Sequence, residues 1–345
     1  TLGLSLTGTP NGNETLTVTP VADSIYDAAS NVASTTQYNN TVNLNEKIPP
    51  TIIAGTTIAY DNTSVVVTFS EPVYNTDGGS GALEKSDFIL SISGGLATVE
   101  STPSSISALG NVYTLGLSLT GTPNGDETLT VIPVADSIYD AAGNVASTLQ
   151  LNNTMNLNDK FPPIISGTTI AFDNSSIVVT LSEAVYNTDS GFGVLEKSDF
   201  TLSISGGLAT VESTPSSISA LGNVYTLGLS LTGTPNGNET LTVNPVADSI
   251  YDAAGNVAST SQSNNTVKLN EKILPIIIAE TTIAYDNTSV VVTFSEAVYS
   301  TDSGSGDLEA SDFTLSISGG LATVESTPSS ISALGNVYTL GLSLT

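Results

Sequence analysis

Residues 114–125 read TLGLSLTGTPNG, and this stretch decides the fold. Its side chains Leu115, Leu117 and Leu119 alternate with Gly, Ser and Thr, and the turn sequence Thr-Pro-Asn-Gly follows. Alternation of period two that ends in turn residues predicts a β-strand with one buried and one exposed face. Residues 65–70, VVVTFS, alternate in the same way. Each segment therefore predicts a strand with one buried and one wet face.

Further segments carry the same signal, and no segment predicts a convincing helix. The expected strands cover residues 52–59, 65–70, 88–93, 96–102, 115–120, 128–134 and 145–151. Seven short strands within about 110 residues are typical of an Ig-like sandwich. The predicted fold class is therefore all-β, with tandem Ig-like seven-stranded β-sandwich domains in a linear array.

Self-comparison defines the domain organisation. TLGLSLTGTPNG begins at Thr1, Thr114 and Thr226, and TLGLSLT begins again at Thr339, so the periods are 113, 112 and 113 residues. A period above about 100 residues is too long for a solenoid unit and fits a self-contained domain. Short proline-containing stretches then divide the chain into the C-terminal part of a repeat, two complete repeats and the N-terminal part of a repeat, at 1–48, 49–161, 162–273 and 274–345.

The two half-repeats leave two interpretations open. The chain reads as a window from a longer array of repeats. Alternatively, the last half of one chain completes the first half of the next in a head-to-tail polymer, although TLGLSLT would then be supplied twice.

Composition excludes several classes of function. The chain has 345 residues, 33 acidic residues and 6 lysines, so its formal charge of −27 makes nucleic acid an unfavourable partner. His, Cys and Trp are absent, which removes imidazole and thiolate chemistry, zinc sites and disulfides. Apolar runs are too short to span a bilayer, and no signal peptide is recognised. The remaining carboxylates, amides and hydroxyls suit a hard cation such as calcium.

The carboxylates gather where the predicted strands end. If seven strands run alternately up and down, ten of the eleven acidic residues of 49–161 fall near the domain ends or in the linker. Stacking such domains would bring like charges together, and calcium at the junction would relieve the repulsion. The strongest motif is residues 135–144, ADSIYDAAGN. The predicted calcium ligands are Asp23, Asp27, Asn31, Glu71, Asp77, Asp87, Asp136, Asp140, Asn144, Asp159, Glu183, Asp189, Asp199, Asp248, Asp252, Asn256, Glu296, Asp302 and Asp312.

Other roles for these residues stay open. Asp and Asn are ordinary turn residues that bond their own backbone, and Glu71 could cap a backbone amide instead of binding a metal. Paired carboxylates could also serve a glycosidase, but the chain lacks Trp platforms and repeats near-identical units. No catalytic residue is therefore predicted.

Three motifs recur in each period: VTFSEPV at 67–73, SDF at 86–88 and YDAAGN at 139–144. Together they resemble the bacterial Ig-like tandem repeats of giant extracellular adhesins and surface filament proteins, of the swimming- or gliding-associated type. The resemblance covers the whole chain. It implies a stalk of sandwiches that holds an adhesive tip away from the cell, in some branches with calcium at the junctions. Ser30 replaces the Gly of the motif in the first copy.

The leading hypothesis is a non-enzymatic extracellular stalk at the bacterial cell surface, stiffened by calcium. Its partners would be the neighbouring repeats of the same chain. The alternative is a self-assembling filament or surface-layer subunit, whose partners would be copies of itself. A glycan-binding module ranks third, because exposed Ser and Thr rows lack the aromatic platforms that glycan sites use.

Overall fold

The computed structural model describes residues 2–344, except for the side chains of residues 279 and 280. The described chain is all-β, with short antiparallel strands and three single-turn 3-10 helices. It divides into two compact units. The first comprises Thr1–Ser166, Leu181–Asp199 and Pro245–Gln262, and the second comprises Gly167–Thr180, Phe200–Asn244 and Ser263–Thr345.

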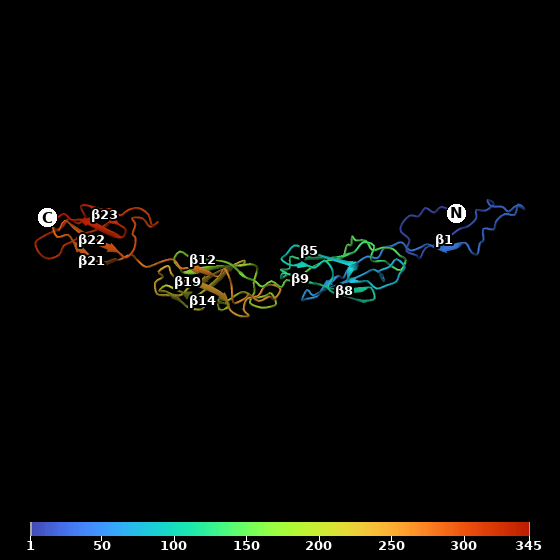
Figure 1. The fold of residues 1–345 in the computed structure, drawn as a ribbon, viewed down its shortest axis with the longest axis horizontal. Helices are drawn as coiled ribbons and strands as arrows, with labels where there is room; N and C mark the ends of the chain where they lie inside the picture. The colour runs from blue at the N-terminus through green and yellow to red at the C-terminus, as the bar shows by residue number, and fades with distance from the viewer. Residues whose placement is uncertain (1, 345) are drawn as a thin grey trace. The chain divides into compact units, whose positions relative to one another are not determined.

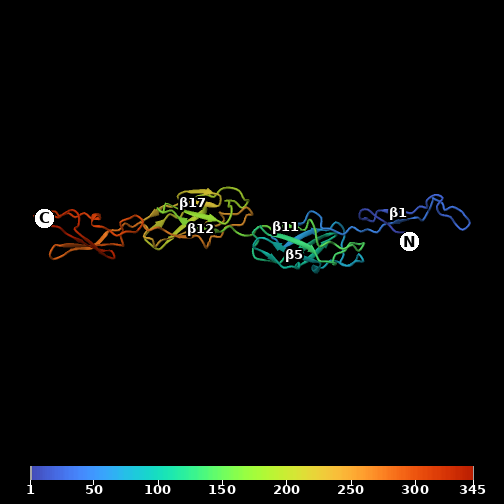
Figure 2. The same cartoon turned by 90° about the horizontal axis from the view of Figure 1, so that it is seen from above.

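The first unit contains two principal sheets. One has the order β3-β4-β8-β7 and the other β11-β10-β5, with β5 and β11 at the two edges of the second sheet (Figure 2). Two smaller sheets pair β6 with β9 and β1 with β2. The bounds are β1 Thr15–Thr17, β2 Thr41–Asn43, β3 Thr57–Ile58, β4 Ser64–Thr68, β5 Phe88–Ser93, β6 Thr98–Val99, β7 Ile106–Leu109, β8 Val112–Gly116, β9 Leu119–Thr120, β10 Thr128–Pro133 and β11 Thr154–Asn156, with the 3-10 turn η1 at Lys85–Asp87.

The core of this unit follows the alternation in the sequence. Val65 and Val67 of β4 are fully buried, and so are Leu129 and Val131 of β10 in the other sheet. These side chains belong to one apolar cluster, so the inward faces of both principal sheets supply the core. The Phe69 ring meets the Tyr113 ring edge-on at 5.8 Å between centroids, a favourable aromatic geometry.

The second unit repeats this pattern. Its sheets have the orders β12-β13-β17-β16, β14-β19-β20, β15-β18 and β21-β22-β24-β23, the last drawn in orange and red (Figure 1). The bounds are β12 Ile165–Ile170, β13 Ser176–Leu181, β14 Phe200–Ser205, β15 Thr210–Val211, β16 Ile218–Leu221, β17 Val224–Gly228, β18 Leu231–Thr232, β19 Thr240–Pro245, β20 Thr266–Lys268, β21 Ile277–Ile283, β22 Ser289–Phe294, β23 Ile331–Leu334 and β24 Val337–Gly341, with the 3-10 turn η3 at Ala310–Asp312. The 3-10 turn η2, Lys197–Asp199, lies in the first unit.

One predicted strand is wrong, and two observed strands lie outside the predicted ranges. Residues 145–151 form no strand, because Ser147 and Gln150 bond to nearby backbone: the Ser147 hydroxyl accepts from Leu149 N at 3.0 Å, and Gln150 Nε2 donates to Ser147 O at 2.7 Å. Such local bonds compete with a strand ladder. The two strands outside the predicted ranges are β11, which pairs with β10, and β7, which pairs with β8. The Ig-like arrangement itself remains a prediction.

A buried carboxylate closes the end of each complete repeat. Glu127 is fully buried, and its side chain accepts hydrogen bonds from the backbone N–H groups of Leu96, Ala97, Asn124 and Gly125 at 2.7 to 3.2 Å. Gly95 makes room for it, because a Cβ there would lie 2.2 Å from the carboxylate. The residue thus ties two turns together.

Glu239 does the same in the second unit. Its side chain accepts from the backbone N–H groups of Leu208, Ala209 and Asn236. Burial acts to raise the pKa of Glu239, but these backbone hydrogen bonds stabilise the charged form and lower the pKa to about 2. A carboxylate held in this way is most stabilising when ionised.

We expect Glu239→Gln to lower the free energy of unfolding at neutral pH by roughly 2 kcal/mol, the scale of hydrogen bonds to a charged acceptor. A depressed folded-state pKa contributes stability above the unfolded value of 4.5, and this stability is lost as pH falls towards about 2. The difference in unfolding free energy between wild type and variant should therefore shrink as pH falls from 4.5 to about 2. Urea unfolding across the pH range measures it. Glu212→Gln, at an exposed position, is the control, and equal losses in the two variants would contradict the role.

Candidate functional site: an acidic cluster after the linker

The linker that carries Asp159 is fixed to the repeat before it. Asn62 Nδ2 donates to Asn158 O at 2.7 Å, and Asn158 N donates to Asn62 Oδ1 at 2.9 Å. Lys160 N donates to Pro123 O at 2.8 Å, and its ammonium lies 3.6 Å from the centre of the Tyr60 ring. These contacts hold both residues that flank Asp159.

The loop that carries Asp252 is organised by that residue itself. Asp252 Oδ1 accepts from Ala254 N and Asn256 N at 2.8 Å, and Oδ2 accepts from Asn256 Nδ2 at 2.7 Å. Gly255 has φ of +82°, and a Cβ on it would lie 2.6 Å from Asp189 O. The backbone angle favours glycine, and the close contact leaves no room for a Cβ.

Glu183 follows strand β13 and is placed by its neighbour. Ser182 N donates to Ile164 O at 2.8 Å, and the Ser182 hydroxyl accepts from Ile164 N at 3.0 Å. The prolines at 162–163 come immediately before Ile164. The linker and the end of β13 are thus tied together by two hydrogen bonds, and this brings Glu183 to the same place as Asp159.

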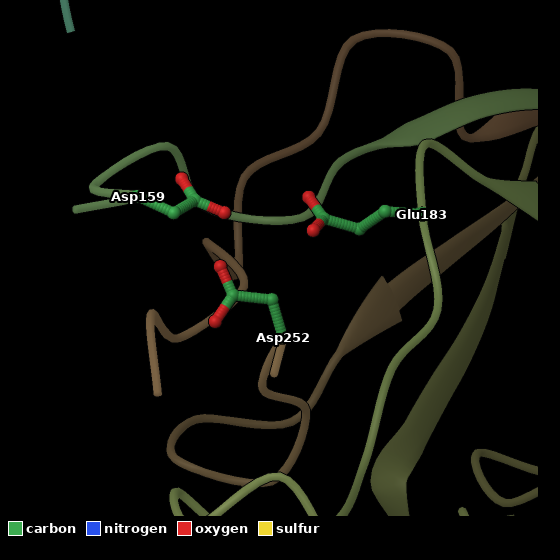
Figure 3. Close-up of side chains that lie close together, drawn as sticks. All are labelled: Asp159, Glu183 and Asp252. Atoms are coloured by element: carbon green, nitrogen blue, oxygen red, sulfur yellow. The ribbon is translucent and has the colours of Figure 1, made fainter. Parts of the chain in front are cut away.

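Three carboxylates meet at this point. Asp159, Glu183 and Asp252 each offer an oxygen atom, and these atoms lie within 4.8 Å of one another. Figure 3 shows the carboxylates of Asp159 and Glu183 pointing towards each other, with that of Asp252 beside them. Asp252 is fully buried, and the other two are half-buried. Among residues 2–344 this is the one set of three such groups in ligand range of one another.

The cluster is electrostatically unfavourable when all three groups are ionised. Burial raises the pKa of Glu183 to about 7, and the charges of Asp252 and Asp159 add to the shift. Burial also raises the pKa of Asp159. A cavity of about 270 Å³ adjoins Asp159 and Glu183 and is lined as well by Asn124, Asp126 and Ser182. This all-oxygen donor set fits a hard divalent cation such as calcium.

Equivalent acids lie together at the start of the first complete repeat. Asn144 Nδ2 donates to Asp140 Oδ2 at 2.7 Å and also to the Glu46 carboxylate. Burial, followed by the charges of Asp140 and Glu46, raises the pKa of Glu71. Here a neutral amide bridges two of the carboxylates. In the second unit, Glu271, Glu296 and Asp302 line a hollow of about 430 Å³.

The other predicted ligands have local roles. Asp87, Asp199 and Asp312 accept from Glu84 N, Glu196 N and Glu309 N at 2.7 to 2.8 Å and so cap the three 3-10 turns. Asp23, Asp136 and Asp248 adopt positive φ near 55°, and their carbonyls accept from the hydroxyls of Tyr26, Tyr139 and Tyr251. Asp77 and Asp189 are exposed, and Asp27 and Asn31 repeat the hydrogen bonds of Asp252 and Asn256.

The predicted ligands did not include Glu46 or Asp126, although Asp126 was counted among the acids at the domain end. Glu46 occupies the linker position of Asp159, in NLNEK against NLNDK, so alignment of the repeats could have found it. Asp126 lines the cavity beside Asp159, where the other copies have Asn13 and Asn238. Where the linker carries Glu, the turn position that corresponds to Asp126 carries Asn. Where the linker carries Asp159, this turn position carries Asp.

Comparisons with known proteins are sparse. No protein-family model matches the chain, and no curated protein matches it. One similar solved structure is the N-terminal part of the bacterial S-layer protein SbsC, with 18% identity and a TM-score of 0.24. That match covers 64% of this chain and 43% of the SbsC chain, so it spans less than half of the latter. A TM-score this low supports no argument about fold or function. Within residues 2–344, no helix is long and apolar enough to cross a membrane.

Without divalent ions, we expect the Glu183 carboxyl to titrate near pH 7. Because its folded-state pKa lies above the unfolded value, its ionisation should destabilise the fold as pH rises from about 4.5 to about 7. Carbon-detected NMR in chelator measures the midpoint. Asp159→Asn removes one repelling charge and should lower it, whereas Asp189→Asn should leave it unchanged. A wild-type midpoint near 4.5 would contradict the electrostatic coupling.

Proposed function

We propose that this chain is a non-enzymatic structural stalk of the bacterial cell surface, in which divalent cations, most suitably calcium, stiffen the connections between tandem β-domains. The observation that carries the proposal is the meeting of Asp159, Glu183 and Asp252 within ligand distance. Asp159 belongs to the linker after one repeat, and the other two belong to the next repeat. A cation bound there would join the two repeats.

The clamped linker supports a mechanical role. Asn62, Asn158 and Lys160 fix the linker to the preceding repeat through hydrogen bonds and a cation–π contact. Asn174, Asn270 and Lys272 repeat this clamp in the second unit, where Asn174 Nδ2 donates to Asn270 O at 2.7 Å and the Lys272 ammonium lies 3.9 Å from the Phe172 ring centre. A linker held in this way transmits orientation and does not act as a flexible tether.

A cation would add stiffness by removing repulsion. Burial, followed by the charges of Asp252 and Asp159, raises the pKa of Glu183 to about 7. Calcium binds six to eight oxygens, so the three carboxylates would supply part of its coordination and Asn124, Asp126, Ser182 or water the rest. The resemblance to adhesin repeats and the absence of imidazole and thiol side chains favour the same extracellular structural role.

Calcium titration of the full chain by calorimetry, with thermal melting and small-angle X-ray scattering, tests the proposal. We expect binding with a dissociation constant on the order of 10⁻⁴ to 10⁻³ M, as in extracellular calcium modules. Binding should raise the melting temperature and narrow the distribution of particle lengths. Glu183→Gln and Asp159→Asn should each weaken binding.

Asp189→Asn is the matched control, because Asp189 is an exposed acid outside the three-acid cluster. It removes the same charge and should leave the calcium affinity intact. Equal weakening by all three substitutions would mean diffuse attraction to net charge. No heat and no change in melting at about 10 mM calcium, well above this affinity range, would rule out the cation mechanism.

A further inference from the structure

Two connections of this chain share a local plan but carry different linker acids. Glu46 and Asp159 occupy the same position, in NLNEK and NLNDK. Each lies against the turn that precedes it. A Cβ on Gly12 would lie 3.2 Å from Glu46 Cβ, and a Cβ on Gly125 would lie 3.3 Å from the Cβ of the other acid. The two acids therefore start from equivalent places, and their side chains differ by one methylene group.

One oxygen of each linker acid holds the linker's own backbone. Glu46 Oε1 accepts a hydrogen bond from Ile48 N. Asp159 Oδ1 accepts in the same way from Phe161 N, at 2.8 Å. In both linkers the second carboxylate oxygen is therefore the one that can meet the loop of the repeat that follows.

The longer acid reaches an amide of that loop. Asn144 Nδ2 donates to Glu46 Oε2 and, at 2.7 Å, to Asp140 Oδ2. Asn144 N also donates to Asp140 Oδ1 at 2.8 Å, so the loop fixes the asparagine through its backbone as well. We call this contact of Glu46, Asn144 and Asp140 the amide latch. It joins the linker acid to the loop acid through hydrogen bonds to charged acceptors, which are among the stronger ones in proteins.

The shorter acid makes no such contact. Asn256 corresponds to Asn144, and its Nδ2 donates to Asp252 Oδ2 at 2.7 Å. Within residues 2–344, Asn256 makes no hydrogen bond to Asp159. The carboxylates of Asp159 and Asp252 instead come within ligand distance of each other and of a third acid, a set that has no counterpart at the first connection among the described residues.

The turn before each linker adds to this difference. Asp126 lines the cavity beside Asp159, whereas its counterpart in the turn before Glu46 is the neutral Asn13. The affinity of an oxygen site for calcium depends on the number of charged ligands. The connection with the shorter linker acid therefore has one more carboxylate and no bridging amide.

We propose that the linker residue specifies how a connection is held. Glu46 is latched to the next repeat by the Asn144 amide, and Asp159 leaves its carboxylate to a divalent cation. The cation half of this inference rests on the proposed function, and the amide latch does not. The first connection is then held without a cation, whereas the second is held only when a cation is bound.

NMR of the full chain in chelator, with nitrogen-15 at asparagine, tests the amide latch alone. Loss of a signal in Asn144→Ser assigns that side chain. Glu46→Asp keeps the charge but shortens the acid, so the Asn144 side-chain amide should exchange with solvent at least about tenfold faster, the scale of one lost hydrogen bond to a charged acceptor. Glu100→Asp, at an exposed position, is the matched control and should leave the exchange unchanged.

Calcium titration by calorimetry tests the exchange of linker residues. Asp159→Glu also keeps the charge, and it should weaken calcium binding at least about tenfold because the longer acid would reach the Asn256 amide. Glu46→Asp combined with Asn13→Asp should add about one calcium equivalent per chain. Asn13→Asp alone adds the same charge without changing the linker, and it should add no site.

The outcomes separate this inference from the proposed function. Calcium binding by the wild-type chain that Asp159→Glu leaves intact would overturn the inference and leave the proposed function standing. An Asn144 amide whose exchange is the same in wild type and in Glu46→Asp would overturn the amide latch, whatever calcium does. No calcium binding by the wild-type chain would overturn the cation half together with the proposed function.

Discussion

Like-charge repulsion at Asp159, Glu183 and Asp252 is the constraint on which the proposed mechanics depend. Neutral groups hold two of the carboxylates in place: Phe161 N donates to Asp159 at 2.8 Å, and Asn256 donates to Asp252 at 2.7 and 2.8 Å. The fold therefore brings the charges together without neutralising them, and Glu183 retains its proton towards neutral pH. At Glu46 and Asp140 an amide of Asn144 bridges the two acids instead. The same architecture thus offers two ways to tolerate crowded carboxylates.

Environment, and not residue type, separates the carboxylates that stabilise from those that repel. Glu239 and Asp252 are both fully buried, but every described partner of the Glu239 side chain is a backbone amide, whereas Asp252 has two further acids in range. Burial favours the neutral form of a carboxyl, and donated hydrogen bonds favour the charged form. At Glu239 the backbone hydrogen bonds outweigh burial and the pKa is lowered, whereas at Glu183 burial outweighs the donated hydrogen bond and the pKa is raised.

Much of the fold could be predicted because alternation and repetition are local properties of the sequence. Residues 65–70 gave strand β4 with the expected buried face, whereas the predicted strand 115–120 is divided between the end of β8 and β9. Asp159, Glu183 and Asp252 were all expected among the ligands of a site. Residues 145–151 were predicted wrongly because side-chain hydrogen bonds from Ser147 and Gln150 leave no trace in apolar periodicity. The sequence also did not predict which of the acids come within ligand distance of one another. That proximity depends on contacts between segments about 70 residues apart, such as those of Glu183 and Asp252.

The three-acid cluster is assembled from a linker and from the repeat that follows, and this division governs how such a gene can change in length. Recombination between near-identical units would insert or remove whole periods of 112 or 113 residues. Each inserted period brings one linker acid and one loop with its Asp, so every new connection inherits a complete set of carboxylates. A chain with more or fewer periods would therefore keep the same pattern of carboxylates at each connection.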